Sequence, residues 1–237
     1  MVADNIRHIL DGVEAACLRL GRSPDSVRLI AVGKTFSPET IREAVDAGIA
    51  DIGENYVQEA VGKRSALDDA RIRWHFIGHL QTNKVKYIAE WVAMIQSVDN
   101  IRCAQEIQKH AARLGRSIDV LVEVNTSAEA TKFGVKPDEA VAFVKSLSDL
   151  PNVNIKGLMT IGPFTDNADE SRASFRTLKR LIDEINAGRE EPLTELSMGM
   201  THDYPIALEE GATMIRIGTA IFGSRVKSVI TPLSPRS

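Results

Sequence analysis

A single lysine stands where an apolar stretch ends, and its position suits carbonyl chemistry. The stretch runs from Leu29 to Thr35 and includes the β-branched residues Ile30 and Val32, which predicts a buried strand that ends at Lys34. Burial disfavours the ammonium form of lysine, so an amine among strand ends loses its proton more easily and can attack a carbonyl carbon. Lys34 is the first candidate for a reactive residue, and the alternative is a lysine that simply marks a strand end.

Two segments near the other end of the chain combine hydroxyl groups with glycines. They are Leu196–Thr201 and Arg216–Gly223, and each follows or ends a predicted strand. Glycine lets backbone N–H groups come close to an anion, although one such segment alone is ordinary turn chemistry. Together with Lys34 they predict a ligand that carries both a phosphate and a carbonyl group. Pyridoxal phosphate is such a ligand, and the lysine would hold it as a Schiff base.

Strands and helices alternate along the whole chain, which is the order that positions these residues. An amphipathic helix is predicted over residues 2–20, ending at Gly21. Strands are predicted over 29–34, 51–54, 73–78, 94–98, 118–124, 153–161, 196–200 and 214–217. Helices are predicted from 38 to 48, from 55 onward, and over 81–91, 99–114, 137–150, 175–185 and 205–210.

Alternation of this kind implies right-handed crossovers and a parallel sheet. We expect an α/β protein, a single (β/α)8 TIM barrel over residues 1–230 with an extra N-terminal helix, followed by a disordered tail over 231–237. An open doubly wound sheet is the alternative, but no GxGxxG motif follows the first strand. In a barrel the loops after the seventh and eighth strands commonly bind a phosphate.

Composition narrows the classes of partner. The chain has 237 residues, 43% of them hydrophobic, and a net charge of −3 with no lysine- or arginine-rich block, which argues against nucleic acid or an acidic membrane as the main partner. It contains neither an apolar run of membrane-spanning length nor a secretory pattern at the N-terminus. Cys17 and Cys103 fit no disulfide or CxxC pattern, so we expect small buried residues in a reduced, cytoplasmic protein.

Two other groups of polar residues are weaker candidates for a metal site or for acid–base catalysis. His75 and His79 fall on a predicted strand, which separates them by about 13 Å, and no third ligand is evident, so no metal site is predicted. Glu54 lies beside Asn55 at a strand–helix junction. It is a candidate general acid, but a carboxylate there more often stabilises the helix start.

Several motifs in order resemble the pyridoxal phosphate homeostasis protein family, whose barrel is similar to the N-terminal domain of alanine racemases. They are AVGKT at 31–35, GENYVQE at 53–59, WHFIGHLQTNK at 74–84, GLMTI at 157–161, LSMGM at 196–200 and RIGTAIFG at 216–223. The resemblance implies that Lys34 forms the Schiff base and that Asn55 lies near the cofactor. It implies phosphate contacts from Ser197, Gly218 and Thr219, and places Arg216 at the pyridine nitrogen. Thr201 stands where many relatives have serine, and both hydroxyls can donate.

Arg216 at the pyridine nitrogen, as the resemblance implies, would affect which reactions the cofactor can support. A guanidinium is always cationic and can only donate, so it favours an unprotonated pyridine ring and stabilises carbanions less than a carboxylate at that position would. This fits racemase-like or non-catalytic use of the cofactor better than transamination. A simple strand-end ion pair is the alternative for Arg216.

Two functions remain. One is a monomeric protein of cofactor homeostasis that holds pyridoxal phosphate and supplies it to apo-enzymes, without robust catalytic activity. The alternative is a pyridoxal-phosphate-dependent amino-acid racemase, which needs a base on each face of the substrate α-carbon. In alanine racemases a tyrosine of an additional domain is the second base. We expect the barrel to take up nearly the whole of this sequence, which leaves too few residues for such a domain. Tyr56, Tyr87 and Tyr204 include no obvious replacement, although Tyr204 follows the seventh strand closely.

Overall fold

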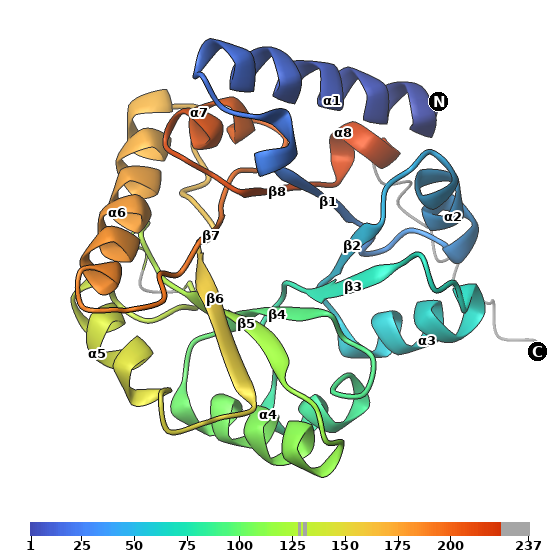
Figure 1. The fold of residues 1–237 in the computed structure, drawn as a ribbon. Helices are drawn as coiled ribbons and strands as arrows, with labels where there is room; N and C mark the ends of the chain where they lie inside the picture. Colours follow the sequence, from blue (N-terminus) through green and yellow to red (C-terminus); the bar gives the residue numbers. More distant parts are fainter. Residues whose placement is uncertain (128, 130–131, 224–237) are drawn as a thin grey trace, which may run out of the picture.

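The computed structural model is a closed barrel of parallel strands with helices around it (Figure 1). It describes residues 1–127, 129 and 132–223, so the tail predicted over 231–237 lies outside the described residues. The strands are β1 Arg28–Val32, β2 Asp51–Glu54, β3 Arg73–Phe76, β4 Met94–Val98, β5 Ile118–Glu123, β6 Val153–Met159, β7 Glu195–Ser197 and β8 Met214–Ile217. Because β1 pairs in parallel with both β2 and β8, the sheet is closed. The predicted barrel is therefore confirmed, and the alternative of an open doubly wound sheet is wrong.

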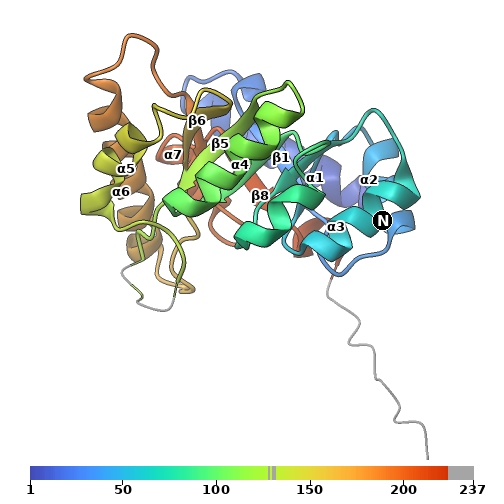
Figure 2. The ribbon, with the colours of Figure 1, turned by 90° about the horizontal axis from the view of Figure 1, so that it is seen from below.

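Helices lie on the outside of the strands in both views (Figures 1 and 2). The α-helices are α1 Val2–Arg19, α2 Pro38–Asp46, α3 Val57–Leu67, α4 Ile101–Arg113, α5 Ala140–Ser146, α6 Ala168–Asn186, α7 Tyr204–Glu209 and α8 Thr219–Phe222. Short 3₁₀ helices are η1 Pro24–Ser26, η2 Thr82–Tyr87 and η3 Pro137–Glu139. Among the residues that the structure describes, no helix is both long and apolar enough to cross a membrane.

The extra N-terminal helix covers a part of the barrel that α8 is too short to cover. Figure 1 shows α1 running past β1 and β8, beside α7 and α8. The Asn5 amide donates to the carbonyl oxygen of Ile221 at 2.8 Å, which ties α1 to α8. Just after α1, the Arg22 guanidinium donates to the carbonyl oxygens of Leu208 and Ala212 at 3.0 and 2.7 Å. The helix therefore completes the outer layer between the last strand and the first.

Several predicted elements differ from the structure in type or in length. The α-helix predicted over 81–91 is the 3₁₀ helix η2, in which residues three apart share a face, so Val85 and Ile88 both point inward. The first strand ends at Val32, and Lys34 lies in the turn that follows. The seventh strand ends at Ser197, so the rest of the LSMGM motif is loop.

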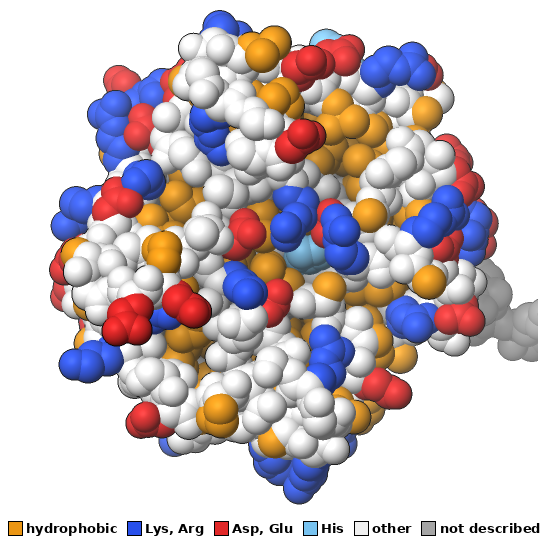
Figure 3. All heavy atoms as spheres, viewed as in Figure 1, with side chains coloured by type: hydrophobic (Ala, Val, Ile, Leu, Met, Phe, Trp, Pro, Cys, Tyr) orange, Lys and Arg blue, Asp and Glu red, His pale blue; other side chains and the backbone are white. Residues whose placement is uncertain are grey.

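Successive strand side chains point alternately into and out of the barrel, and those that point in are partly apolar and partly polar. The apolar ones, Ile30, Met94, Leu121, Met159 and Met214, form a cluster separate from the larger core between strands and helices. Cys17 and Cys103 belong to the larger core as free, buried thiols, as predicted. Figure 3 looks along the barrel axis and shows basic and acidic side chains with a histidine gathered at the centre of one end.

Candidate functional site

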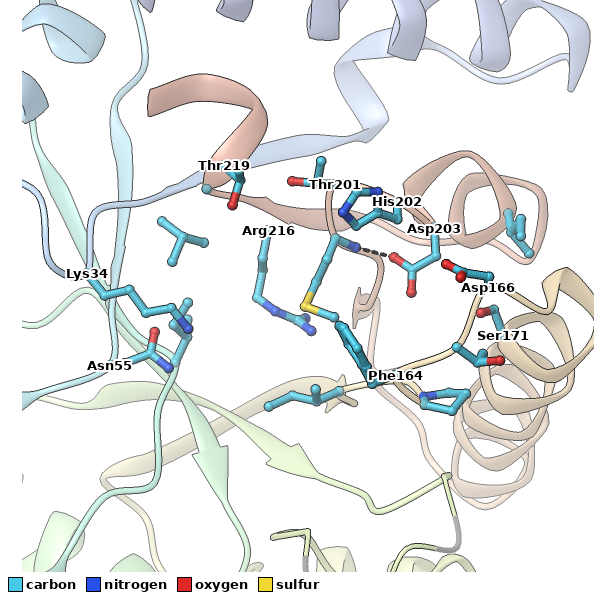
Figure 4. A pocket seen from close by; sticks show the side chains of 18 of the residues that line it. Lys34, Asn55, Phe164, Asp166, Ser171, Thr201, His202, Asp203, Arg216 and Thr219 are labelled. Atoms are coloured by element: carbon cyan, nitrogen blue, oxygen red, sulfur yellow. Dashed lines mark hydrogen bonds between the residues drawn. The ribbon is translucent and has the colours of Figure 1, made fainter. Parts of the chain in front are cut away.

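A cavity of about 820 Å³ lies at the carboxyl ends of the strands. Its lining includes Lys34, Asn55, Arg216, Gly218 and Thr219, so the fold brings together all of the predicted site residues except Ser197. Figure 4 shows Lys34 and Asn55 on one side, Arg216 in the middle, and Phe164, Asp166 and Ser171 on the opposite side. Residues Met200–Asp203 after β7 complete the wall near Thr219.

Lys34 lies in a turn whose backbone is held by a neighbouring helix. The lysine is half-buried, and the next residue, Thr35, has a φ of 70°, in the left-handed region that non-glycine residues rarely adopt. The Thr35 backbone N–H donates to Glu59 Oε2 of α3 at 2.8 Å. This contact stabilises the unusual conformation directly beside Lys34.

Lys63 of α3 holds the other side of the same turn. Its ammonium group donates to the Gly33 carbonyl oxygen at 2.8 Å, to Glu54 Oε1 at 2.8 Å and to Glu59 Oε2 at 3.0 Å. Lys63, Glu54 and Glu59 are called the turn clamp below. The clamp binds the residues before and after Lys34, so the direction of the Lys34 side chain depends on α3 as well as on β1.

Glu54 is the buried member of the turn clamp. It ends β2 with 1% of its surface exposed, and burial raises its pKa to about 7, against the opposing effect of the Lys63 charge. A Cβ on Gly33 would stand 2.7 Å from Glu54 Oε1, so the close approach of the turn to this carboxyl requires glycine. Glu54 therefore pairs with Lys63 rather than stabilising the start of α3, which corrects the interpretation from sequence.

Asn55 follows β2 and contributes an amide to the cavity. Its backbone lies against Gly78, where a Cβ would stand 2.4 Å from the Asn55 carbonyl oxygen, so the loop after β3 can pass only with glycine there. Asn55 Oδ1 is buried and has no hydrogen-bond partner within the described part of the chain. Buried polar atoms in proteins are almost always paired, so an unpaired amide on a cavity wall indicates a place for a ligand.

Arg216 points from β8 into the barrel and lines the cavity with 4% of its surface exposed. Its Nη1 donates to Ser197 Oγ at 2.6 Å, and its Nη2 donates to the Thr160 carbonyl oxygen at 2.7 Å. Burial lowers the pKa of Arg216 to about 10, while the charges of Glu123 and Asp203 oppose this effect. The guanidinium is therefore a fixed cation at neutral pH, aimed at the middle of the cavity.

Ser197 differs from the expectation that it contacts a phosphate. It is the last residue of β7, its exposed fraction is 0%, and its hydroxyl donates to Gln96 Oε1 at 2.6 Å while accepting from Arg216. The inward side of the strand places this hydroxyl inside the barrel, outside the cavity lining. Thr201 instead brings a hydroxyl to the cavity, in a loop where the Met200 N–H donates to Asp203 Oδ1 at 2.6 Å (Figure 4).

His75 and His79 contact other side chains of the protein. His75 is buried within hydrogen-bond distance of Asp51 and Gln96, whereas His79 stacks on Phe133 with ring centroids 3.9 Å apart. Over residues 1–127, 129 and 132–223, no group of three or more metal-binding side chains is present.

The tyrosines lie away from the cavity. Tyr56 and Tyr87 are 55% and 48% exposed on the surface. The Tyr204 hydroxyl faces α1, where a Cβ on Gly12 would stand 2.7 Å from it. None of the three is part of the cavity lining, so no tyrosine of the described chain is placed to act there as a base.

The sequence did not single out several residues that contact the site residues or line the cavity. Glu59 and Lys63 are four apart on one helix, a common surface pair, and nothing in their spacing marks Lys63 as buried. Gln96 lies among apolar residues in β4, beside Ser97, and two polar residues in a buried strand are a signal of internal hydrogen bonds. Phe164, 95% exposed on the cavity rim, comes from a polar stretch without a recognisable pattern.

Comparison with known proteins agrees with this geometry. A family model described as the alanine racemase N-terminal domain matches residues 15–226. The pyridoxal phosphate homeostasis protein of Aquifex aeolicus (strain VF5) is 45% identical over 222 residues, which cover 94% of this chain and 97% of the relative.

Two solved structures extend the comparison. An unknown protein from Bifidobacterium adolescentis superposes with a TM-score of 0.87 at 38% identity, covering 93% of this chain and 94% of that one. PipY of Synechococcus elongatus PCC7942, solved with PLP bound, has a TM-score of 0.81 at 37% identity and covers 94% of this chain and 100% of its own. The chain therefore belongs to the pyridoxal phosphate homeostasis protein family, within the wider alanine racemase N-terminal domain family.

Proposed function

We propose that the protein binds pyridoxal 5'-phosphate through Lys34 and holds it as a reserve in cofactor homeostasis. The observation that carries the proposal is the position of Lys34. It is the lysine in the lining of the cavity at the carboxyl ends of the strands. PipY, which shares 37% of its residues with this chain, was solved with PLP in place.

The residues present fit this cofactor. The Asn55 amide on the Lys34 side of the cavity has a buried oxygen without a partner, as expected of a group whose hydrogen bonds a ligand completes. Thr201, Gly218 and Thr219 lie after β7 and β8, where barrels commonly bind phosphate. Arg216 lies between the two groups and would donate to a ring nitrogen of the cofactor. When bound, the cofactor would supply a carbonyl carbon for imine chemistry and a conjugated ring that accepts electrons.

Lys34 would hold the cofactor through its side-chain amine. The cofactor would supply an aldehyde carbon for a C=N bond to Lys34 Nζ, and the aldehyde oxygen would leave as water with the two protons of the unprotonated amine. The turn clamp fixes the backbone on either side of Lys34 while this occurs.

Storage and supply account for the site better than racemisation does. A racemase needs a second base opposite the lysine, and no tyrosine of the described chain lines the cavity. Arg216 as the partner of the ring nitrogen would also give weak carbanion stabilisation. We further propose that the protein acts as a cytoplasmic monomer, delivers its cofactor to apo-forms of pyridoxal-phosphate enzymes, and has neither nucleic acid nor membrane as a partner.

Borohydride reduction followed by peptide mass spectrometry tests the central assignment. The protein loaded with pyridoxal phosphate should carry the reduced adduct on Lys34, and Lys34→Ala should carry none. Lys86→Ala removes an exposed lysine of η2 and should label like the unmodified protein. An adduct on another lysine, or none in the unmodified protein, would overturn the proposal.

A further inference from the structure

An ordered series of hydrogen bonds runs through the barrel interior away from Arg216. The Ser197 hydroxyl accepts from Arg216 and donates to Gln96 Oε1, both at 2.6 Å. Gln96 Nε2 lies 3.0 Å from His75 Nδ1. The other ring nitrogen, His75 Nε2, lies 2.8 Å from Asp51 Oδ1. Ser197, Gln96, His75 and Asp51 are called the interior relay below.

The interior relay is buried along its length and comes from different strands. Ser197, Gln96, His75 and Asp51 have exposed fractions of 0%, 0%, 3% and 4% and lie on β7, β4, β3 and β2. Its far end is anchored by Arg73, whose Nε and Nη2 donate to the two Asp51 oxygens at 2.9 and 2.5 Å. Buried polar groups of this kind are costly unless all of them are paired, so the order of donors and acceptors is constrained.

That order can be read from Arg216 outward. A guanidinium has only donors, so Ser197 Oγ must accept from it. The Ser197 hydroxyl proton must therefore be donated to a different group. Gln96 Oε1 is that acceptor, which turns the Gln96 amino group toward His75 Nδ1. An amino group can only donate, so Nδ1 must carry no proton. His75 Nε2 then carries the proton and donates it to the Asp51 carboxylate.

A histidine protonated on both nitrogens would break this order. Its Nδ1–H would face the Gln96 amino group, and the amide would have to turn so that its oxygen met the ring. The Ser197 hydroxyl would then face an amino group, and its proton would lose its acceptor inside the barrel. One ring form is therefore compatible with a fully paired Ser197 and Arg216.

We propose that Gln96 and His75 are positioning residues for Arg216, with His75 neutral and protonated on Nε2, and that they act through Ser197. The order of hydrogen bonds stands on the geometry alone, whereas the consequence for cofactor binding rests on the function proposed above. The relay orients the Ser197 hydroxyl, and the oriented hydroxyl holds one end of the guanidinium that faces the cavity.

Nitrogen-15 NMR of the cofactor-free protein tests the ring form directly. Two-bond ¹H–¹⁵N spectra distinguish the two neutral tautomers and the imidazolium, and loss of a signal in His75→Asn assigns the ring. We expect His75 with a bare Nδ1 and a protonated Nε2 at neutral pH. The opposite tautomer or an imidazolium would overturn the proposal. In Gln96→Glu a carboxylate faces Nδ1, so His75 should become protonated on both nitrogens, and an unchanged ring there would also contradict it.

Cofactor titrations test the consequence for Arg216. Gln96→Leu should weaken pyridoxal phosphate binding about tenfold, because the Ser197 hydroxyl that holds Arg216 loses its hydrogen-bond acceptor. Gln108→Leu is the matched control, since Gln108 also uses both ends of its amide, on Asn152, outside the cavity lining. Ser197→Ala should resemble Gln96→Leu, and Ser197→Thr, which keeps a hydroxyl, should recover most of the affinity.

The outcomes separate the two proposals. Thermal unfolding of the cofactor-free variants identifies any that fail to fold, and the NMR result on the unmodified protein does not depend on them. Equal affinities in Gln96→Leu and Gln108→Leu, both folded, would overturn the positioning role. If the unmodified protein binds no pyridoxal phosphate, the proposed function fails while the observed His75 tautomer still decides the hydrogen-bond order.

Discussion

The Lys63 ammonium lies 2.8 Å from the carbonyl oxygen of Gly33, so the residue before Lys34 is held by a side chain from α3. Lys63 and its partner Glu54 are 7% and 1% exposed, which makes this a buried ion pair. Removing one partner of a buried pair leaves the other charge without compensation, and that loss is larger than the net contribution of the intact pair. The support of the Lys34 turn is therefore sensitive to a single substitution on a neighbouring helix.

At pH 8, where Glu54 with its pKa of about 7 is mostly ionised, Lys63→Met should lower the free energy of unfolding by about 3–5 kcal/mol, because the buried Glu54 carboxylate loses its counter-ion. It should also weaken pyridoxal phosphate binding, since the Gly33 carbonyl is released beside Lys34. Urea denaturation of the cofactor-free protein measures the first effect and a cofactor titration measures the second. Lys109→Met is the control, because Lys109 also pairs with a glutamate at 2.8 Å but is 49% exposed. Equal stability losses in the two variants would contradict the importance of the turn clamp.

Thr201→Val should weaken binding of pyridoxal phosphate by about 0.5–3 kcal/mol, the range for one hydrogen bond to a charged group. Binding of pyridoxal, which has no phosphate, should change little. Isothermal titration with both compounds measures the difference. Thr177→Val is a matched control, because its hydroxyl donates to the Ala173 carbonyl within α6 and is absent from the cavity lining. Equal losses for pyridoxal and its phosphate would show that Thr201 does not contact the phosphate.

Glu123→Gln should remove a pH dependence of stability. Burial, reinforced by the charge of Asp99 and opposed by that of Arg216, raises the Glu123 pKa from 4.5 to about 7 in the folded protein. The folded state thus binds the proton more tightly than the unfolded state, so this carboxyl's contribution is full below pH 4.5 and is lost as pH rises through 7. The loss amounts to about 3 kcal/mol at most. Urea denaturation at pH 5 and pH 8 should give a smaller difference for Glu123→Gln than for the unmodified protein, and an equal difference would contradict the shift.

The protein should not racemise alanine efficiently. Lys34 can act on one face of the substrate α-carbon. No tyrosine of the described chain lines the cavity to act on the other face, and loss of a positioned base typically costs about 10²–10⁴-fold in rate. Incubation with L-alanine in heavy water, with exchange of the α-proton and chirality followed separately, tests both faces. Slow exchange without inversion agrees with a one-sided site. Inversion with a kcat of about 1 s⁻¹ or more would favour a racemase, and His202, which lines the cavity, would then be the first residue to replace.

The order of elements could be predicted well because it depends on local patterns. β8 spans Met214–Ile217, as predicted, and α1 ends just before Gly21, whose φ of 65° suits a helix end. The 3₁₀ helix η2 was mistaken for an α-helix because apolar residues three apart serve both kinds of helix. The end of β1 was placed two residues too late, since sequence alone does not show where a chain turns away from the sheet.

The sequence by itself determined the class of fold and predicted five residues that line the cavity, which are Lys34, Asn55, Arg216, Gly218 and Thr219. Strand ends of a parallel barrel converge on one side, so Lys34, Asn55 and Gly218 could be expected to meet from their places in the chain. Only the tertiary structure decided how each side chain is used. Ser197, which the resemblance implies as a phosphate contact, accepts a hydrogen bond from Arg216 in the structure. Lys63, which no sequence pattern singled out, donates to the Gly33 carbonyl oxygen. These contacts join residues that are distant in sequence or on different elements, and their distance and burial depend on how strands and helices pack, which no local pattern encodes.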